Sequence, residues 1–246
     1  MTVTVTVTVT SPAPSDAVDE GAADHRVRVA EHKRERMRER LIEATLAAYA
    51  ECAAGRHPVV EDVIRIAEVS RGSFYKHFDA IDEVFAVIGR RMAHEMLSSY
   101  SHLAAPLPDG AARVALGPLM ALLRAAMEPS HGAFIARVDF IDYLAGDEPR
   151  AHVVGLSLRH GRECGALHFR SPDAAIDLLI GACLEGTRRI LRTRQVDIAA
   201  VHELTAMVLR GLGVEAAESE HAVAQAWQRL QDEAATLPWW KPLPGA

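Results

Sequence analysis

The sequence predicts an all-α protein, and three observations support this prediction. Alanine, leucine and arginine, which favour helices, are abundant, and runs of β-branched residues are rare after residue 10. Apolar residues recur at steps of three and four, which is the spacing of one helix face. Glycine and proline stand between these segments, where helices end. With 246 residues, 49% of them hydrophobic, the chain can form a substantial core in one or two domains.

The first 24 residues predict a disordered tail. Thr and Val alternate through the opening positions, which is the spacing of a β-strand. No partner strand is evident elsewhere in the chain, and a lone strand is not stable in water. Proline, serine, aspartate and glycine follow, and these residues are typical of disordered segments.

Four helices are predicted in the next part of the chain. The first has an apolar stripe in its second half and ends before Gly55 and Pro58, two residues that stop helices. The third follows Ser70, whose hydroxyl can cap it by accepting a hydrogen bond from a backbone N–H of the first turn. The predicted ranges are residues 32–54, 59–66, 71–78 and 81–103.

The rest of the chain is also predicted to be helical. Its strongest pattern is the wide apolar stripe of residues 174–193. The proline-rich end, LPWWKPLPGA, carries Trp239 and Trp240, which either fold back over the body or move freely in solvent. The predicted ranges are residues 111–127, 133–145, 149–164, 174–193, 198–212 and 218–235.

The composition argues against a membrane or secreted protein. No apolar run approaches the roughly 18 residues of a membrane span, and the start lacks the basic and apolar regions of a signal peptide. Cys52, Cys164 and Cys183 show no pairing pattern, which indicates a reducing compartment. We therefore expect a cytoplasmic protein without membrane contact.

The charges are distributed unevenly along the chain. The formal net charge is −6, which does not by itself suggest nucleic acid. Residues 25–78, however, hold eleven Lys and Arg against eight Asp and Glu, so this part is basic. Phosphates respond to local charge rather than to the total, and this region is therefore a candidate for contact with nucleic acid.

The predicted helix 71–78 has an unusual composition. Phe74 and Phe78 fall one turn apart and can bury against the two preceding helices. Small residues, an aromatic hydroxyl and cations occupy the outer side, which holds Arg71, Gly72, Ser73, Tyr75, Lys76 and His77. Small residues let the backbone approach base edges, Arg can donate two hydrogen bonds to guanine, and Lys, Tyr and His can reach phosphates. Two short helices joined by a tight turn form a helix-turn-helix, whose second helix enters the major groove.

The segment VVEDVIRIAEVSRGSFYKHFDAIDEV, behind the helix RERLIEATLAAYAE, resembles the DNA-binding domain of TetR-type (tetracycline-repressor-like) transcriptional regulators. The resemblance covers about residues 36–92. It implies an N-terminal three-helix helix-turn-helix domain and a C-terminal helical domain for ligand binding and dimerisation. It also implies repression that is relieved when ligand binding changes the separation of the two DNA-binding heads of a homodimer. The implied divisions are a tail (1–24), the DNA-binding domain (25–80), the ligand and dimerisation domain (81–214) and an extra helix with a proline-rich tail (215–246).

The resemblance assigns contacts to individual residues. It implies that the start of the third helix and Lys76 meet bases or nearby backbone, and that Tyr75 and His77 hold phosphates. A basic arm before the first apolar stripe could add phosphate or minor-groove contacts, or its cations could pair with neighbouring glutamates on a solvated helix face. The expected DNA-contacting residues are Ser70, Arg71, Gly72, Ser73, Tyr75, Lys76, His77 and Arg36.

The sequence departs from the family pattern in three places. Pro58 and Val59 stand where the family has threonines, and Ile81 stands where a lysine often holds a phosphate. Glu68 replaces the usual glycine of the turn. If this residue adopts a left-handed conformation, Glu costs roughly 1 kcal/mol or more relative to Gly. These departures could weaken DNA binding.

The predicted C-terminal domain offers a ligand pocket and a dimer interface. Flexible apolar side chains with a few polar groups are typical of small-molecule sites. The pocket residues expected are Tyr100, Met120, Arg124, Met127, Phe134, Arg137, Phe140 and Tyr143. The predicted helices 174–193 and 198–212 have apolar stripes too wide for one neighbour, which suggests a four-helix contact between two copies, with a monomeric core as the alternative. The interface residues expected are Ile176, Ile180, Leu184, Val201, Thr205 and Val208.

Other functions find less support in the sequence. His160, Glu163 and Cys164 share a helix face and could bind a cation only with further ligands. No nucleophile–base set or phosphate loop is evident, so we expect neither an enzyme nor a cofactor. The expected partners are double-stranded DNA, a small-molecule effector and a second copy of the chain. The alternative is a helical sensor that has lost DNA binding and acts through a protein partner.

Overall fold

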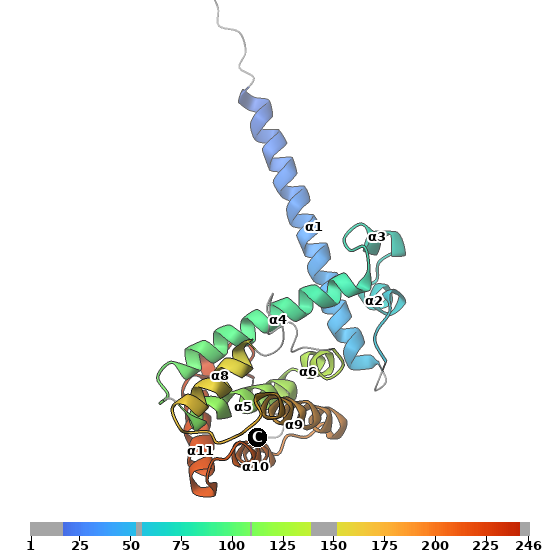
Figure 1. The fold of residues 1–246 in the computed structure, drawn as a ribbon. Coiled ribbons are helices and arrows are strands. Elements are labelled where there is room, and N and C mark those ends of the chain that lie inside the picture. Colours follow the sequence, from blue (N-terminus) through green and yellow to red (C-terminus); the bar gives the residue numbers. More distant parts are fainter. Residues whose placement is uncertain (1–16, 53–55, 109, 139–151, 242–246) are drawn as a thin grey trace, which may run out of the picture. The chain divides into compact units, whose positions relative to one another are not determined.

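The computed structural model describes residues 17–52, 56–108, 110–138 and 152–241. Across these residues the protein is all-helical, with ten α-helices, one short 3₁₀-helix and no strand (Figure 1). The predicted fold class is therefore confirmed. The chain divides into two compact units, residues 1–40 and residues 41–246.

The first four helices are α1 (Ala17–Glu51), α2 (Val60–Ala67), α3 (Arg71–Tyr75) and α4 (Ile81–Ala104). α1 begins earlier than predicted, because residues 17–24, three of which are Ala, form helix instead of tail. Residues 1–16, the rest of the predicted tail, lie outside the described residues. α3 is shorter than predicted, because the N–H of His77 bonds to the carbonyl of Phe74 at 2.9 Å and tightens the last turn.

The remaining helices are α5 (Ala111–Met127), α6 (Pro129–Ile135), α8 (His152–Glu163), α9 (Pro172–Thr193), α10 (Ile198–Gly211), α11 (Ala216–Asp232) and the 3₁₀-helix η1 (Ala234–Thr236). The bounds of α5 are those predicted. α6 begins before the predicted position because Pro129 occupies its first turn, where a missing N–H costs nothing. The later part of that predicted helix, residues 139–145, lies outside the described residues.

The core of the larger unit surrounds α5. This helix packs against α9, α10 and α11, and most of its side chains are buried (Figure 1). Leu116, Leu119 and Leu123 have no exposed surface. Because α5 is apolar on nearly all sides, it can serve as the central helix of the bundle.

The C-terminal segment folds back onto the body. Trp239 is almost fully buried, and its Nε1 donates a hydrogen bond to Ser99 Oγ at 3.3 Å. Lys241 Nζ lies 2.9 Å from Glu128 Oε1 and forms an ion pair with it. The structure therefore supports the alternative in which this segment folds back over the body, as far as Lys241.

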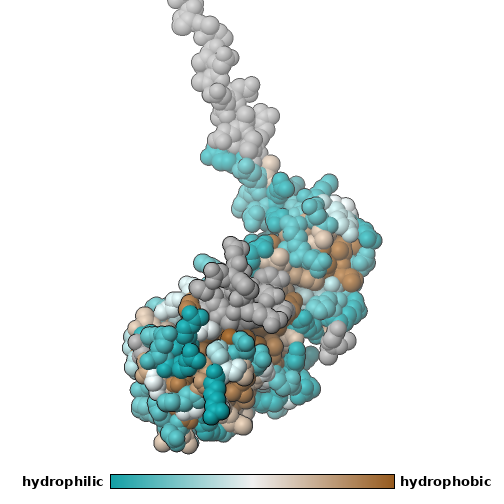
Figure 2. All heavy atoms as spheres, viewed as in Figure 1, coloured by the Kyte–Doolittle hydropathy of each residue, from teal (hydrophilic) through white to brown (hydrophobic). Residues whose placement is uncertain are grey.

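Hydrophilic residues cover much of the face seen in Figure 2, with hydrophobic residues between them. Within the described ranges, none of the helices combines the length and the apolar character that crossing a lipid bilayer requires.

Candidate DNA-binding surface and ligand cavity

Two aromatic side chains anchor α3 to the unit. Phe74 and Phe78 are buried, and their ring centres lie 6.0 Å apart. α2 contributes Val63 and Ala67, which are also buried, and it packs against α3. The predicted inner face of α3 is therefore the buried one, because these apolar side chains have a single side on which to leave water.

The turn between α2 and α3 has a defined hydrogen-bonding pattern. Glu68 adopts a left-handed conformation, with φ of 50° and ψ of 48°. Its N–H bonds to the carbonyl of Arg65, and the N–H of Val69 bonds to the carbonyl of Ile64. These two bonds form a Schellman motif, the helix ending at which glycine is usual. The strained position expected from the sequence is thus present at Glu68.

Ser70 starts α3 as its N-cap. Its Oγ accepts a hydrogen bond from the N–H of Ser73 at 3.1 Å, as the sequence predicts. At the start of α2, where the family has a threonine, Asp62 Oδ2 accepts from the N–H of Val59 at 3.1 Å. Asp62 also pairs with Arg56 at 2.6 Å. A carboxylate three positions into α2 therefore fixes this helix start without a threonine.

The outer side of α3 is open to solvent. Arg71, Gly72, Tyr75 and Lys76 are exposed, and Ser73 is half-buried. A Cβ placed on Gly72 would meet only the Ser70 hydroxyl, at 4.0 Å, so the backbone here is accessible. His77 is half-buried at the end of the helix. The structure thus brings the predicted α3 residues together on one surface.

Arg71 is held in place by two neighbours. Its Nη1 lies 2.9 Å from Glu61 Oε1, and its guanidinium carbon lies 5.8 Å from the centre of the Tyr75 ring. The hydrogen bond with Tyr75 and the negative charge of Glu61 raise the pKa of Arg71. In this arrangement the Arg71 guanidinium lies beside Glu61 and Tyr75 on the surface. Arg36 is exposed on α1 within residues 1–40, and its part in DNA binding stays a prediction.

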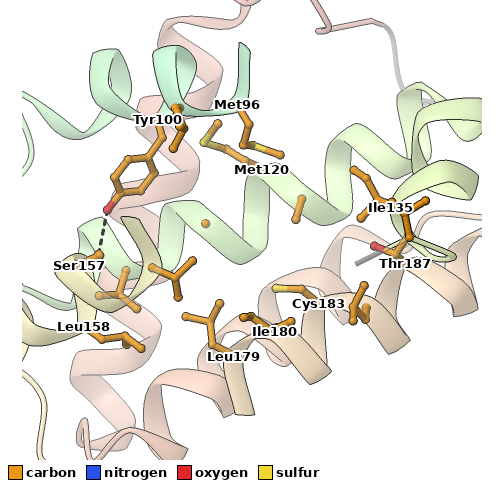
Figure 3. Close-up of a pocket in the computed structure, with 17 residues that line it drawn as sticks. Met96, Tyr100, Met120, Ile135, Ser157, Leu158, Leu179, Ile180, Cys183 and Thr187 are labelled. Atoms are coloured by element: carbon orange, nitrogen blue, oxygen red, sulfur yellow. Dashed lines mark hydrogen bonds between the residues drawn. The ribbon is translucent and has the colours of Figure 1, made fainter. Parts of the chain in front are cut away.

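A cavity of about 170 Å³ lies among α4, α5, α8 and α9, with the end of α6 at one side (Figure 3). Tyr100 and Met120, two of the predicted pocket residues, line it. Ile180 and Leu184, which the sequence assigns to the dimer interface, line it as well. α9 therefore presents part of its wide apolar stripe to this cavity.

The other described residues of the predicted pocket lie elsewhere. Arg124 is buried and forms ion pairs with Glu95 at 2.6 Å and Glu128 at 3.2 Å. Met127 is buried, and its sulfur accepts a hydrogen bond from the N–H of Lys241. These two residues therefore stabilise the packing around α5. Phe140 and Tyr143 lie outside the described residues.

Phe134 and Arg137 connect the end of α6 to the end of α1. The Phe134 ring packs edge to face against Tyr49, with centres 5.1 Å apart. The guanidinium of Arg137 donates to the backbone carbonyls of Tyr49 and Cys52. Since the last carbonyls of a helix have no partners within it, Arg137 caps the C-terminus of α1.

Half of the predicted dimer residues are buried within the protomer, which corrects that prediction. Val201, Thr205 and Val208 are at most 2% exposed, so they have no surface to offer a second copy. The apolar stripe of α10 meets α5, α9 and α11 instead. Ile176 is half-buried. On the outer side of these helices, Leu178 is 40% exposed and Met207 is 55% exposed. This outer side was hard to find in the sequence, because on each helix only one large apolar residue, Leu178 or Met207, is exposed there.

No group of three or more metal-binding side chains occurs among the residues that the structure describes. Cys164 Sγ donates a hydrogen bond to the carbonyl of Gly161 at 3.3 Å.

The fold is shared with solved structures of RolR. RolR in complex with the ligand resorcinol matches with a TM-score of 0.58 at 19% identity, over 78% of this chain and 95% of that chain. RolR without ligand matches with a TM-score of 0.55 at 18% identity, over 76% and 96%. A gamma-butyrolactone receptor described as an ArpA-like protein gives a TM-score of 0.49 at 16% identity, over 81% and 98%. No family model and no curated protein matches the sequence. The TetR-like fold expected from the α2–α3 motif is confirmed by the RolR structures.

Proposed function

We propose that this protein is a ligand-responsive transcription regulator that binds DNA as a homodimer through the outer side of α3. The observation that carries the proposal is the geometry of α2 and α3. Phe74 and Phe78 hold a short helix against the unit, while Arg71, Tyr75 and Lys76 remain exposed on its other side. A helix that enters the major groove needs this division between an anchored and an open side.

The three exposed side chains suit different parts of the duplex. Arg71 has an exposed guanidinium, which can donate two hydrogen bonds to a guanine edge once it leaves its ion pair with Glu61. Lys76 and the hydroxyl of Tyr75 are suited to phosphate oxygens. Glu61 and Glu68 place two acids nearby, and they oppose indiscriminate attraction to phosphates. We therefore expect binding that depends on sequence more than on charge alone.

The cavity of the C-terminal helices is the proposed effector site. It is mostly apolar with a few hydroxyls, as small-molecule sites usually are. RolR, which shares the fold, has been solved with resorcinol bound, and this supports a small-molecule effector for the present chain.

The outer sides of α9 and α10 are the proposed dimer interface. Leu178 and Met207 are exposed there, although both are large and apolar. Gly211 brings the two helices close, since a Cβ at this position would come within 2.6 Å of Leu178 Cδ2. A two-fold contact through this side would place two copies of α3 for a near-palindromic operator.

The end of α6 is the proposed connection between effector and DNA. Ile135 and Val138 line the cavity, whereas Phe134 and Arg137, on the same short stretch, contact the end of α1. We expect a ligand that displaces Ile135 and Val138 to move the adjacent Phe134 and Arg137 as well. Such coupling between two sites is typically worth about 1–3 kcal/mol. We expect it to be negative, so that effector binding releases DNA.

Selection of bound fragments from random DNA, followed by mobility shifts on the selected site, tests the proposal. We expect a near-palindromic site, and weaker binding by the Tyr75→Ala and Arg71→Ala variants. Arg90→Ala is the control, because it removes an exposed Arg from α4 instead of α3. Recovery of random fragments only, with equal affinity for all variants, would exclude DNA reading by α3. The sensor that acts through a protein partner would then be the better explanation, and the acids Glu61 and Glu68 would favour it.

A further inference from the structure

We infer that the cavity binds an uncharged molecule with a single six-membered ring whose hydroxyl group donates a hydrogen bond to the Tyr100–Ser157 pair. The inference rests on the proposed function, because it names the chemical class of the effector. Size, charge and hydrogen bonding support it separately.

The volume of the cavity sets the size of the ligand. It measures about 170 Å³. An engineered apolar cavity of about 150 Å³ in another protein remains dry and binds benzene. The present cavity therefore has space for one ring with a small substituent, and a larger ligand would have to extend through its open side.

The lining of the cavity disfavours ions. None of the described residues that line it carries a charge. Most of its surface comes from aliphatic and thioether side chains, among them Met96, Met120, Ile135, Leu158, Leu179 and Ile180 (Figure 3). A charged ligand would lose its hydration there without gaining a counter-charge, which is costly. Burial raises the pKa of the Cys183 thiol to about 12, so this lining group also stays neutral.

The main hydrogen-bonding feature of the cavity is a pair of hydroxyls. Tyr100 Oη lies 3.0 Å from Ser157 Oγ, and Figure 3 shows this contact at one end of the cavity. Tyr100 Oη also lies 3.2 Å from the backbone carbonyl oxygen of Arg113. A carbonyl can only accept, so Tyr100 donates its single proton to Arg113. Burial raises the pKa of Tyr100, which keeps this proton in place.

This arrangement decides what the ligand must supply. With the Tyr100 proton used, Ser157 is the donor in the contact between the two hydroxyls. The lone pairs of Ser157 Oγ then remain for a ligand, and they can only accept a hydrogen bond. A phenol or cyclic alcohol satisfies them, whereas an ether or a ketone of the same shape does not. Ser157 is half-buried, and a ligand that covers it without donating leaves its acceptor without a partner, which is costly, so the pair discriminates between these classes.

Calorimetric titration of the full chain, without DNA, tests the inference with three matched probes. Para-ethylphenol has the predicted hydroxyl, para-ethylanisole has it methylated, and the para-ethylbenzoate ion replaces it with a charge. We expect the phenol to bind about fivefold to tenfold more tightly than the anisole. The benzoate should bind at least about 100-fold more weakly than the phenol.

Two variants of Ser157 separate recognition from packing. Ser157→Ala removes the acceptor and should abolish the preference for the phenol over the anisole. Ser157→Thr keeps a hydroxyl and should retain the preference. Unliganded melting of both variants shows whether they fold, so that a loss of binding is not mistaken for unfolding.

Three results would overturn the inference: an anisole that binds as tightly as the phenol, a benzoate that binds more tightly, or no binding by any probe at its solubility limit. These outcomes are independent of DNA. A phenol that binds without changing operator affinity would support the ligand class and contradict the proposed effector response. A chain that binds its operator but not the phenol would support DNA binding and contradict the ligand class.

Discussion

α3 and α10 differ in how many neighbours enclose them. α3 packs against α2 and is anchored through Phe74, which leaves Arg71 and Lys76 exposed on the opposite side. α10 contacts α5, α9 and α11, so both Val201 and Val208, which lie two turns apart, are buried. The surface that a helix can offer to a partner is the surface that its own neighbours leave uncovered. For α3 that surface is a full face, and for α10 it is the narrow strip around Met207.

The predicted effects of substitution on the two helices follow from this difference. Val208→Glu should have a large effect on folding. It places a carboxylate where Val208 is 2% exposed, on a helix that packs against α5, α9 and α11. An unpaired buried charge costs about 3–5 kcal/mol of unfolding free energy, which can unfold a domain of ordinary stability. Urea denaturation measures the loss. Unchanged stability of this variant would show that α10 is oriented the other way round.

Met207→Glu sharpens the same comparison from the exposed side. Because Met207 is 55% exposed, the change in unfolding free energy of the protomer should stay within about 0.5 kcal/mol. The added charge should nevertheless separate the proposed dimer, since two copies would face each other across the two-fold axis. Sedimentation velocity distinguishes the species. A Met207→Glu protein that sediments as an intact dimer would exclude this strip as the interface.

Phe74→Ala and Tyr75→Ala test whether α3 has the two distinct sides described. Phe74 has no exposed surface, so Phe74→Ala should lower the unfolding free energy by about 3–5 kcal/mol. Tyr75 is exposed, so Tyr75→Ala should lower the unfolding free energy by less than about 1 kcal/mol, and it should weaken DNA binding. Chemical denaturation gives the first quantity and mobility shifts give the second. Equal destabilisation by the two variants would contradict the open outer side of α3.

Arg71→Ala and Lys76→Ala test which residues of the outer side of α3 contact bases and which contact phosphates. We expect Arg71→Ala to lose about 1–3 kcal/mol of discrimination at one base pair of the operator. Lys76→Ala should weaken binding to all sequences alike and reduce the slope of affinity against salt by about 1. Competition with point-mutated operators at several salt concentrations separates the two. A uniform loss of affinity in both variants would mean that Arg71 contacts phosphate and not a base.

Glu68→Gly should have the smallest effect, with the opposite sign. Glu68 has a φ of 50°, which a residue with a Cβ tolerates poorly. Glycine should raise the unfolding free energy by about 1 kcal/mol and remove an acid from the neighbourhood of DNA. Glu68→Ala is the matched control, because it removes the acid but keeps the Cβ, and it should not stabilise. Equal stability of the Gly and Ala variants would show that the left-handed turn is not strained.

Several features could be predicted from the sequence because they depend on short stretches of chain. The bounds of α5 and the cap at Ser70 follow from local propensity and local hydrogen bonds, and the left-handed turn at Glu68 was indicated by the resemblance to a family that has glycine there. The orientation of α3 also follows locally, since only Phe74 and Phe78 needed to leave water. For these features, the residues that decide the structure lie within one or two turns of each other.

Other features could not be predicted, because the apolar character of a residue does not indicate which part of the protein it will pack against. Leu184 lines the cavity and Val208 lies in the core, yet in the sequence both are equally good candidates for a dimer contact. Arg137 was expected in the pocket, and its guanidinium instead caps α1 through two carbonyls far away in the chain. The sequence by itself determined the described helices, the bounds of α5 and the open side of α3. Only the tertiary structure decided which apolar side chains surround a cavity, fill the core or remain outside, because the hydrophobic effect is not directional and any apolar partner satisfies it.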